Sequence, residues 1–555
     1  MTTTHSSNKC TPHTIDFIVR DTDPELQVVE DDITKDLARI GITVNVKFLD
    51  SESYIEAEKH GTYNMLFTRT WGAPYDPHSY MSSWSVPSHV EYSAIGTLEP
   101  PLSRDRLLNK IESVQQELDV VKRSEQWAEI LNDIHQQAIF LPLWGSRSPF
   151  VVNRRLKNFQ PPPQAYIFPL DSVLVQSGPK TVTIAPGSGG ALFTSVGPMN
   201  PHQYFPNQLF VSGWIYEGLV SYGEGGTIVP ALATDWQIEP FKQGQRATFQ
   251  LRDGVKFHDG TDWNCTVAKL NFDHILSPIV RQRHAWYNTP NKLDRWYCNA
   301  NDDFVLETSV PFYPLLQELT YTRPLVSASA AAFAQGLDSD PDLHNSCNPG
   351  DFGPKFDHLE EEVTCAGLIA PIGTGPFKFV NRTFLERGNE EIDESVVFAA
   401  HTEYWGQVPD IQTLIIKHYE NSDDVYAALM AGELDMTLGT GPLTNIQVRD
   451  IQYNNATHFQ VVHSEILQNA VLVLNTNRTP TNDINVRKAI IHGVNKAEFI
   501  NKEFAGLEQP ANELLPLNTP YCDVDLNPKW NYDLEKALLL NCSDEDSSLS
   551  GGAIA

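Results

Sequence analysis

Aromatic, basic and imidazole side chains are concentrated in one short stretch near the start of this 555-residue chain. Residues Arg69–His78 read RTWGAPYDPH, and His89 follows in a Pro-Ser-His tripeptide. Neutral imidazole is a ligand for nickel, copper and zinc, guanidinium grips carboxylates through paired hydrogen bonds, and indole or phenol rings offer flat apolar walls. The same residue types also fill cores or lie solvated in loops. Their chemistry therefore depends on the elements that position them.

Periodic segments on both sides of this stretch predict an α/β fold. Residues 15–49 indicate strand, helix and strand, because apolar residues recur at three- and four-residue spacing and then alternate. Such a unit implies a parallel sheet with a right-handed crossover. Residues 104–137 indicate helices, and residues 139–144 indicate a strand.

The later chain continues the same alternation of strands and helices. Residues 160–181 are rich in proline and then polar, which indicates a surface connection before a new strand at Thr181. A helix is expected to begin near Asp262 or Asn264, and a final helix covers about 532–540. The acidic segment 336–366 is typical of a surface insertion.

Composition excludes several classes of protein. Forty basic against seventy acidic residues give a net charge of −30, which disfavours nucleic acid as a partner. We find no apolar run of membrane-spanning length and expect no signal peptide in the polar N-terminus. No HExxH, GxSxG or P-loop pattern is present, so we expect no enzyme and no catalytic residues.

Seven cysteines are present, at positions 10, 265, 298, 347, 365, 522 and 542. No CxxC pair occurs, so we expect no structural zinc site. Cys347 and Cys365 lie at either side of the acidic insertion, which a disulfide between them would close.

A long series of motifs resembles one known family. The landmarks are RTWGAPYDPH, GPMNPH (197–202), LRDGVKFHDGTDW (251–263), IGTGPFKF (372–379), EYWG (403–406), AGELDM (431–436) and LNTNRTPTNDINVRKAI (474–490). They are similar to solute-binding protein family five, the binders of peptide and nickel ABC importers, and most of all to its nickel-binding members. The resemblance covers nearly the whole chain.

The order of the motifs departs from the family, in which the piece resembling residues 181–555 comes first and the piece resembling 11–170 comes last. The resemblance therefore implies a two-lobed, periplasmic-binding-protein type of α/β fold in circularly permuted order, or one out-of-phase period of a tandem array. Lobe I would cover residues 143–472, and lobe II residues 1–142 plus 473–555. Cys10 and Cys542 would meet at the seam, either as a disulfide or as two unpaired thiols.

The resemblance also implies a site in the cleft between the lobes. His89 matches the histidine that completes coordination of a metal delivered inside a small carboxylate chelator. The matching ligand contacts are Arg283, Arg323, Trp71, Tyr75, Trp286 and Tyr204, and Arg69 adds a third positive group beside Trp71. Leu209 stands where nickel binders have a methionine, so a sulfur contact is absent. His78 and His202 are expected to be structural.

These expectations define a function and its rivals. The chain would be a monomeric periplasmic or extracellular binder that captures a nickel chelate and closes on it for an ABC importer. Arg283, Arg323 and His89 together favour that ligand over a peptide, since peptide binders typically need an acidic group for the amino terminus. The alternatives are a peptide or other small-solute binder, a ligand-sensing ectodomain from a tandem array, or a product that no longer closes.

Overall fold

The computed structural model describes residues 9–21, 24–165, 167–188, 191–197, 199–202, 209–223, 226–276, 288–321, 323–333, 370–387, 390–504 and 508–543. The chain divides into two compact units. Unit 1 comprises Met1–Val114, Val120–Arg147 and Ile466–Ala555, and unit 2 comprises Gln115–Asp119 and Ser148–Glu465.

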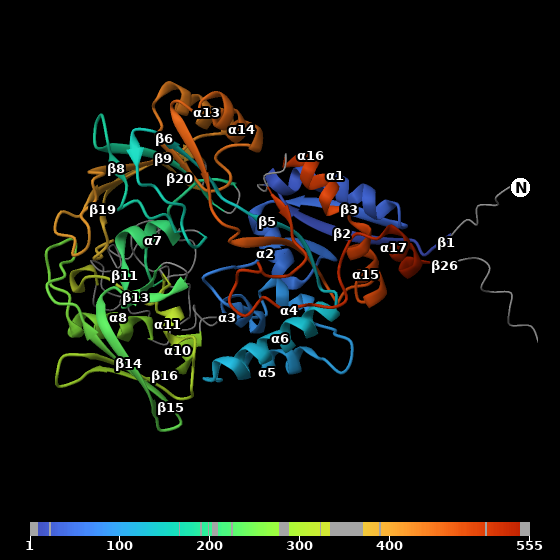
Figure 1. Ribbon diagram of the computed structural model, residues 1–555, viewed down its shortest axis with the longest axis horizontal. Helices are drawn as coiled ribbons and strands as arrows, with labels where there is room; N and C mark the ends of the chain where they lie inside the picture. The colour runs from blue at the N-terminus through green and yellow to red at the C-terminus, as the bar shows by residue number, and fades with distance from the viewer. Residues whose placement is uncertain are drawn as a thin grey trace, which may run out of the picture. The chain divides into compact units, whose positions relative to one another are not determined.

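Unit 1 is built on a six-stranded sheet that takes strands from both ends of the chain. Its order is β25 (Gln509–Pro510), β5 (Phe140–Ser146), β24 (Gln468–Leu474), β4 (Met65–Arg69), β2 (His13–Arg20) and β3 (Ile42–Leu49). The β2 strand runs parallel to β3 and β4, whereas β24 is antiparallel to β4 and β5. Figure 1 shows that unit 1 combines both ends of the chain, because early segments, coloured blue, lie among late segments, coloured orange and red.

Helices cover both faces of this sheet. Alternation along β2 sends Phe17 and Val19 into one core and Ile18 into the other. The first core includes side chains of α1 (Pro24–Ala38), α15 (Ile484–Gly493), α16 (Lys496–Glu503) and α17 (Leu534–Asn541). The second includes side chains of α2 (Ser51–His60), α3 (Pro77–Met81), η1 (Ser82–Ser85), α4 (Val90–Ala94), α5 (Arg104–Val114) and α6 (Val120–Gln136).

The two ends of the described chain pair with each other. Strand β1 (Lys9–Cys10) is antiparallel to β26 (Cys542–Ser543), with Cys10 opposite Cys542 in the register. The amide of Thr11 donates to the carbonyl of Asn541, whose side chain donates back to the Thr11 carbonyl. Cys542 is disulfide-bonded. Unit 1 is therefore completed by residues from both ends of the chain.

Unit 2 contains two larger sheets and three short strand pairs. The larger sheet has the order β19 (Phe377–Arg387), β20 (Glu390–Ala400), β21 (Thr413–Lys417), β9 (Thr181–Ser188), β22 (Met436–Leu438), β6 (Pro149–Asn153) and β23 (Phe459–His463), and β10 (Ala191–Leu192) pairs with β9. The second sheet is β14 (Ala233–Phe241), β15 (Gly244–Leu251), β17 (Phe304–Thr308) and β16 (Leu293–Cys298). The pairs are β11 (Glu217–Gly218) with β18 (Val326–Ser327), β12 (Val220–Tyr222) with β13 (Ile228–Pro230), and β7 (Leu156–Lys157) with β8 (Leu174–Val175).

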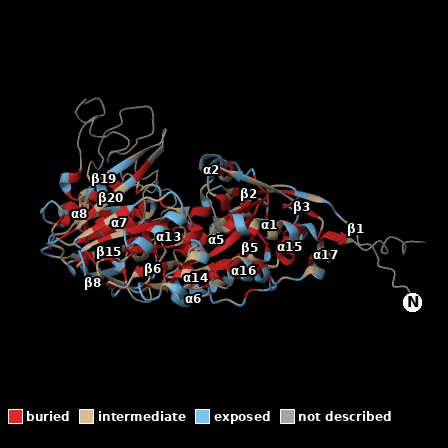
Figure 2. Ribbon diagram, turned by 90° about the horizontal axis from the view of Figure 1, so that it is seen from above, coloured by how far each residue is buried: buried red, intermediate tan, exposed pale blue. Residues whose placement is uncertain are grey.

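Helices cover these sheets as well. The larger sheet packs against α7 (Leu209–Ile215) in one core and against α13 (Ser422–Ala431) and α14 (Asn445–Asn454) in another. The second sheet packs against α8 (Cys265–Ile275), and shorter helical segments are α10 (Asn288–Lys292), α11 (Leu315–Glu318) and η3 (Ala330–Ala332). Figure 2 shows buried residues concentrated along the strands of both units. Among the described helices, we find none with the length and apolarity needed to cross a bilayer.

The α/β fold predicted from the sequence is confirmed, and so is the strand–helix–strand unit over 15–49. The predicted boundaries at 142/143 and 472/473 fall inside β5 and β24, whereas the two compact units divide at Arg147/Ser148 and Glu465/Ile466. The helical prediction for 104–137 is correct except at 115–119, where α5 has ended and α6 has not begun, and at 137, which follows the end of α6. The acidic insertion, with Cys347 and Cys365, lies outside the described residues.

Candidate functional site

The segment that follows β4 forms a tight turn that brings two aromatic rings together. The amide of Tyr75 donates to the carbonyl of Gly72 at 3.1 Å. A side chain at Gly72 would place its Cβ 2.6 Å from the carbonyl oxygen of Leu467, so only glycine fits. The rings of Trp71 and Tyr75 lie 5.2 Å apart between centroids and are partly exposed.

Arg69 ends β4 immediately before this turn. Its guanidinium carbon lies 4.8 Å from the centre of the Phe67 ring, a cation–π distance. Arg69 is half-buried. Arg69 precedes Trp71 by two positions in the chain, and its place beside the aromatic rings stays a prediction.

The next histidine has a structural role. His78 is fully buried, and its Nδ1 lies 2.5 Å from a carboxylate oxygen of Asp76. The same carboxylate accepts from the His78 amide and caps α3. His202 is equally buried and contacts His274 and the carbonyl of Val326. Both predictions of a structural histidine agree with these contacts.

His89 differs from these two histidines. It occupies the N-cap position of α4 and is partly exposed. Its imidazole makes no hydrogen bond or ion pair with any part of the chain that the structure describes. Partial burial lowers the pKa of His89 below 6.5, because desolvation penalises the charged form. The ring is therefore neutral at pH 7, the form that ligates nickel, copper or zinc.

The predicted arginine and aromatic contacts of unit 2 are described only in part. Arg323 is 3% exposed and precedes a cis peptide bond to Pro324. Arg283, Trp286 and Tyr204 lie outside the described residues. The structure thus brings Trp71 and Tyr75 together. Both lie in unit 1, as do Arg69 and His89, whereas Arg323 belongs to unit 2.

A buried carboxylate in unit 2 was not recognised from the sequence. Both oxygens of Glu217 accept hydrogen bonds at 2.8 Å, one from Tyr404 and the other from Thr374 and Trp405. Burial raises the pKa of Glu217 to about 7 against these donors. Two of the landmark motifs, IGTGPFKF and EYWG, supply all three donors, so the motifs were a signal that a shared partner existed.

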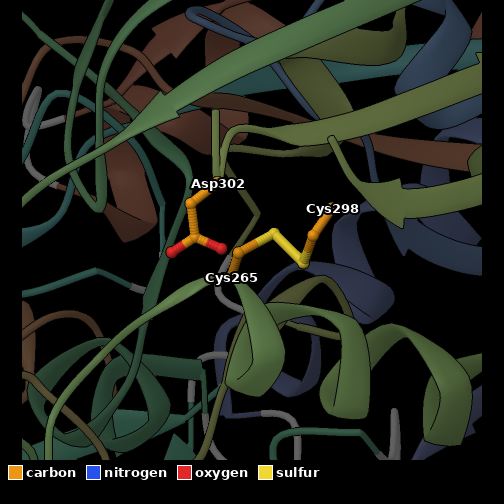
Figure 3. Close-up of side chains that lie close together, drawn as sticks. All are labelled: Cys265, Cys298 and Asp302. Carbon is orange, nitrogen blue, oxygen red and sulfur yellow. A yellow bond between two sulfur atoms is a disulfide. The ribbon is translucent and has the colours of Figure 1, made fainter. Parts of the chain in front are cut away.

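One grouping of metal-type side chains occurs in the described residues, at Cys265, Cys298 and Asp302. Figure 3 shows that the two sulfur atoms are bonded to each other, with the carboxylate of Asp302 beside them. Sulfurs joined in a disulfide offer no thiolate to a metal, so the group is a link between α8 and β16. The thiol of Cys522 is free and buried, and burial raises its pKa.

Comparison with known proteins places the chain in a family of solute-binding proteins. The family model described as bacterial extracellular solute-binding proteins, family 5 Middle, matches residues 227–540. The nickel-binding periplasmic protein of Escherichia coli strain K12 is 30% identical over 347 residues, which cover 62% of this chain and 58% of that protein. The glutathione-binding protein GsiB of Pectobacterium atrosepticum is 24% identical over 353 residues, covering 63% and 58%.

The solved structures include a relative with a bound metal chelate. The crystal structure of NikA from Brucella suis in complex with Fe(III)-EDTA matches with a TM-score of 0.51 and 28% identity, covering 65% of this chain and 63% of that one. This chain therefore spans about three fifths of the length of the curated relatives that it matches.

Proposed function

This chain belongs to the bacterial extracellular solute-binding proteins of family 5, and from that premise we propose that it captures a nickel or other divalent metal ion bound in a small carboxylate chelate. We further propose that it does so outside the cytoplasmic membrane, delivers the chelate to the membrane subunits of an ABC importer, and performs no covalent chemistry. The observation that carries the proposal is the partly exposed imidazole of His89, which makes no hydrogen bond or ion pair with the described part of the chain.

Each proposed group has a distinct task. His89 supplies one ligand to the metal, and the chelator supplies the others, because one imidazole alone holds a divalent ion weakly. Arg323 and Arg283 pair with free carboxylates of the chelator. Trp71 and Tyr75, whose rings lie 5.2 Å apart, provide apolar area against the body of the chelator, together with Trp286 and Tyr204. Two named relatives, the nickel-binding protein and the Fe(III)-EDTA complex, support this ligand class.

Isothermal titration of the metal-stripped protein tests the proposal. The ligands are nickel alone, nitrilotriacetate alone and Ni(II)-nitrilotriacetate, a carboxylate chelate that leaves coordination positions open on the metal, followed by nickel with histidine. The wild type should bind a metal-loaded chelate more tightly than either component. His89→Ala should remove that metal-dependent gain and keep binding of the free chelator. His60→Ala, which changes an exposed histidine on α2 of the same unit, is the matched control.

The arginine assignment is tested separately. Arg323→Ala should weaken binding of the free and the loaded chelator alike by ~1.5–3 kcal/mol, the contribution of a charge-assisted hydrogen bond. Arg295→Ala, which removes a side chain that is 58% exposed in the same unit, should change the affinity for neither form of the chelator.

Equal affinity for both chelator forms in wild type and in His89→Ala would contradict the metal proposal.

A small peptide is the second candidate ligand, since one relative is named a glutathione-binding protein. Glutathione carries two carboxylates and no metal. Tight binding of glutathione together with absence of binding of every metal chelate would transfer the assignment to peptides.

A further inference from the structure

The helix that carries His89 is too short to hold its own shape. Helix α4 has five residues, and His89 at its N-cap makes no side-chain capping hydrogen bond. Isolated helices of this length are unstable in water, so tertiary contacts must fix the segment. A metal ligand also needs a fixed position, because coordination tolerates only small displacements of the donor atom.

Two buried tyrosine hydroxyls supply such contacts directly after His89. The hydroxyl of Tyr63 donates to the carbonyl of Val90 at 2.7 Å. The hydroxyl of Tyr80 donates to a carboxylate oxygen of Glu91, also at 2.7 Å. All four of these residues are at most 6% exposed. The two positions that follow His89 are thus each bonded to a different part of unit 1.

The two tyrosines come from separate supports. Tyr63 lies two residues before the strand β4, and Tyr80 lies on α3, where its ring packs edge-on against Trp84 at 5.7 Å between centroids. One bond fixes the backbone of α4 and the other fixes a side chain from its first turn. Together they restrict rotation as well as translation of the segment that begins at His89.

We propose that Tyr63 and Tyr80 are positioning residues that hold the His89 imidazole in the orientation required for metal coordination. This inference rests on the proposed function, since it specifies how the same site presents its protein ligand. Neither tyrosine needs to touch the chelate, because both act through Val90 and Glu91. Partners that hydrogen-bond a metal ligand directly typically change metal affinity by roughly 10–100-fold, so we expect the lower end of that range for contacts one and two residues away from His89.

Single-oxygen deletions test the proposal. Tyr80→Phe and Tyr63→Phe should each lower the affinity for Ni(II)-nitrilotriacetate or Ni(II)-histidine by roughly 10-fold, with less than about a twofold change for the free chelator. Tyr54→Phe is the matched control, because that buried hydroxyl donates at 2.7 Å to the carbonyl of Phe67 and not to α4. Glu91→Gln keeps an acceptor for Tyr80 and should retain the wild-type affinity.

The readouts separate positioning from general stability. Ligand-field absorption of the bound nickel reports imidazole coordination, and it should be lost in Tyr80→Phe and retained in Tyr54→Phe at matched thermal stability. Histidine-selective NMR of the ligand-free protein should show a broadened His89 resonance in the two tyrosine variants alone. A sharp, unshifted His89 resonance and an unchanged nickel affinity in both variants would overturn the inference while leaving the proposed function intact. Absence of any metal-dependent gain in the wild type would overturn both.

Discussion

Removing residues 1–20 deletes β1 and β2 and should unfold unit 1. Strand β2 lies between β3 and β4 in the sheet, so its loss breaks two ladders at once. Its four core side chains, Ile15, Phe17, Ile18 and Val19, are at most 2% exposed. Each contributes about 1.5–3 kcal/mol by burial, which amounts to roughly 6–12 kcal/mol. Domains are stable by only about 5–15 kcal/mol, so little or no stability would remain.

Hydrogen exchange followed by mass spectrometry measures this effect in each unit. In the full chain, the amides of β3, β4 and α1 should be protected. In the truncated chain they should exchange at the rate of unfolded peptide, while β20 and β21 of unit 2 keep their protection. Deletion of residues 1–8 is the matched control, because it leaves β1 and β2 in place. Unchanged protection of β3 and β4 after removal of residues 1–20 would refute the conclusion that unit 1 needs both ends of the chain.

Three further predictions concern unit 2. Burial raises the pKa of Glu217 from 4.5 to about 7. Between these two pH values the folded protein retains a proton that the unfolded chain has lost, so the free energy of unfolding falls as pH rises. Glu217→Gln should remove this fall from a series of urea denaturations at increasing pH. Arg155→Ala leaves the Asp435 carboxylate without its paired hydrogen bonds at 2.7 and 2.8 Å and should cost about 3 kcal/mol in the same assay. Cys265→Ser opens the disulfide to Cys298, which spans 33 residues, and should lower the unfolding free energy by about 2–4 kcal/mol.

Local periodicity was sufficient for some elements and failed where distant residues decide the structure. Every apolar residue of the predicted α1 stripe, such as Leu26 and Ile33, is fully buried. The helical prediction over 104–137 included residues 115–119, which lie between two helices, and Leu118 among them is 50% exposed. Helix α5 has ended at Val114, and the carbonyl of the next residue, Gln115, accepts from the amide of Tyr313. No local pattern encodes a bond between positions so far apart.

In the candidate site, too, contacts between residues close in the sequence could be anticipated, and contacts between distant residues could not. The contact between Trp71 and Tyr75 follows from a tight turn within five residues and could be anticipated. The donors to Glu217 lie 157, 187 and 188 positions away from it. A carboxylate in the sequence gives no indication of whether such donors will surround it. Motif resemblance located the donors but not the residue that they share.

The position of the segment that carries Trp71 and Tyr75 depends on contacts with residues late in the chain. The amide of Thr70 donates to the carbonyl of Asn469, and the Asn469 amide donates back to the Thr70 hydroxyl. Gly72 packs against the carbonyl of Leu467 at a distance that excludes any side chain. The aromatic pair is therefore positioned by residues nearly four hundred positions later. Folding of unit 1 and formation of this part of the site are one event, so a ligand that binds here adds its binding free energy to the stability of the joined ends.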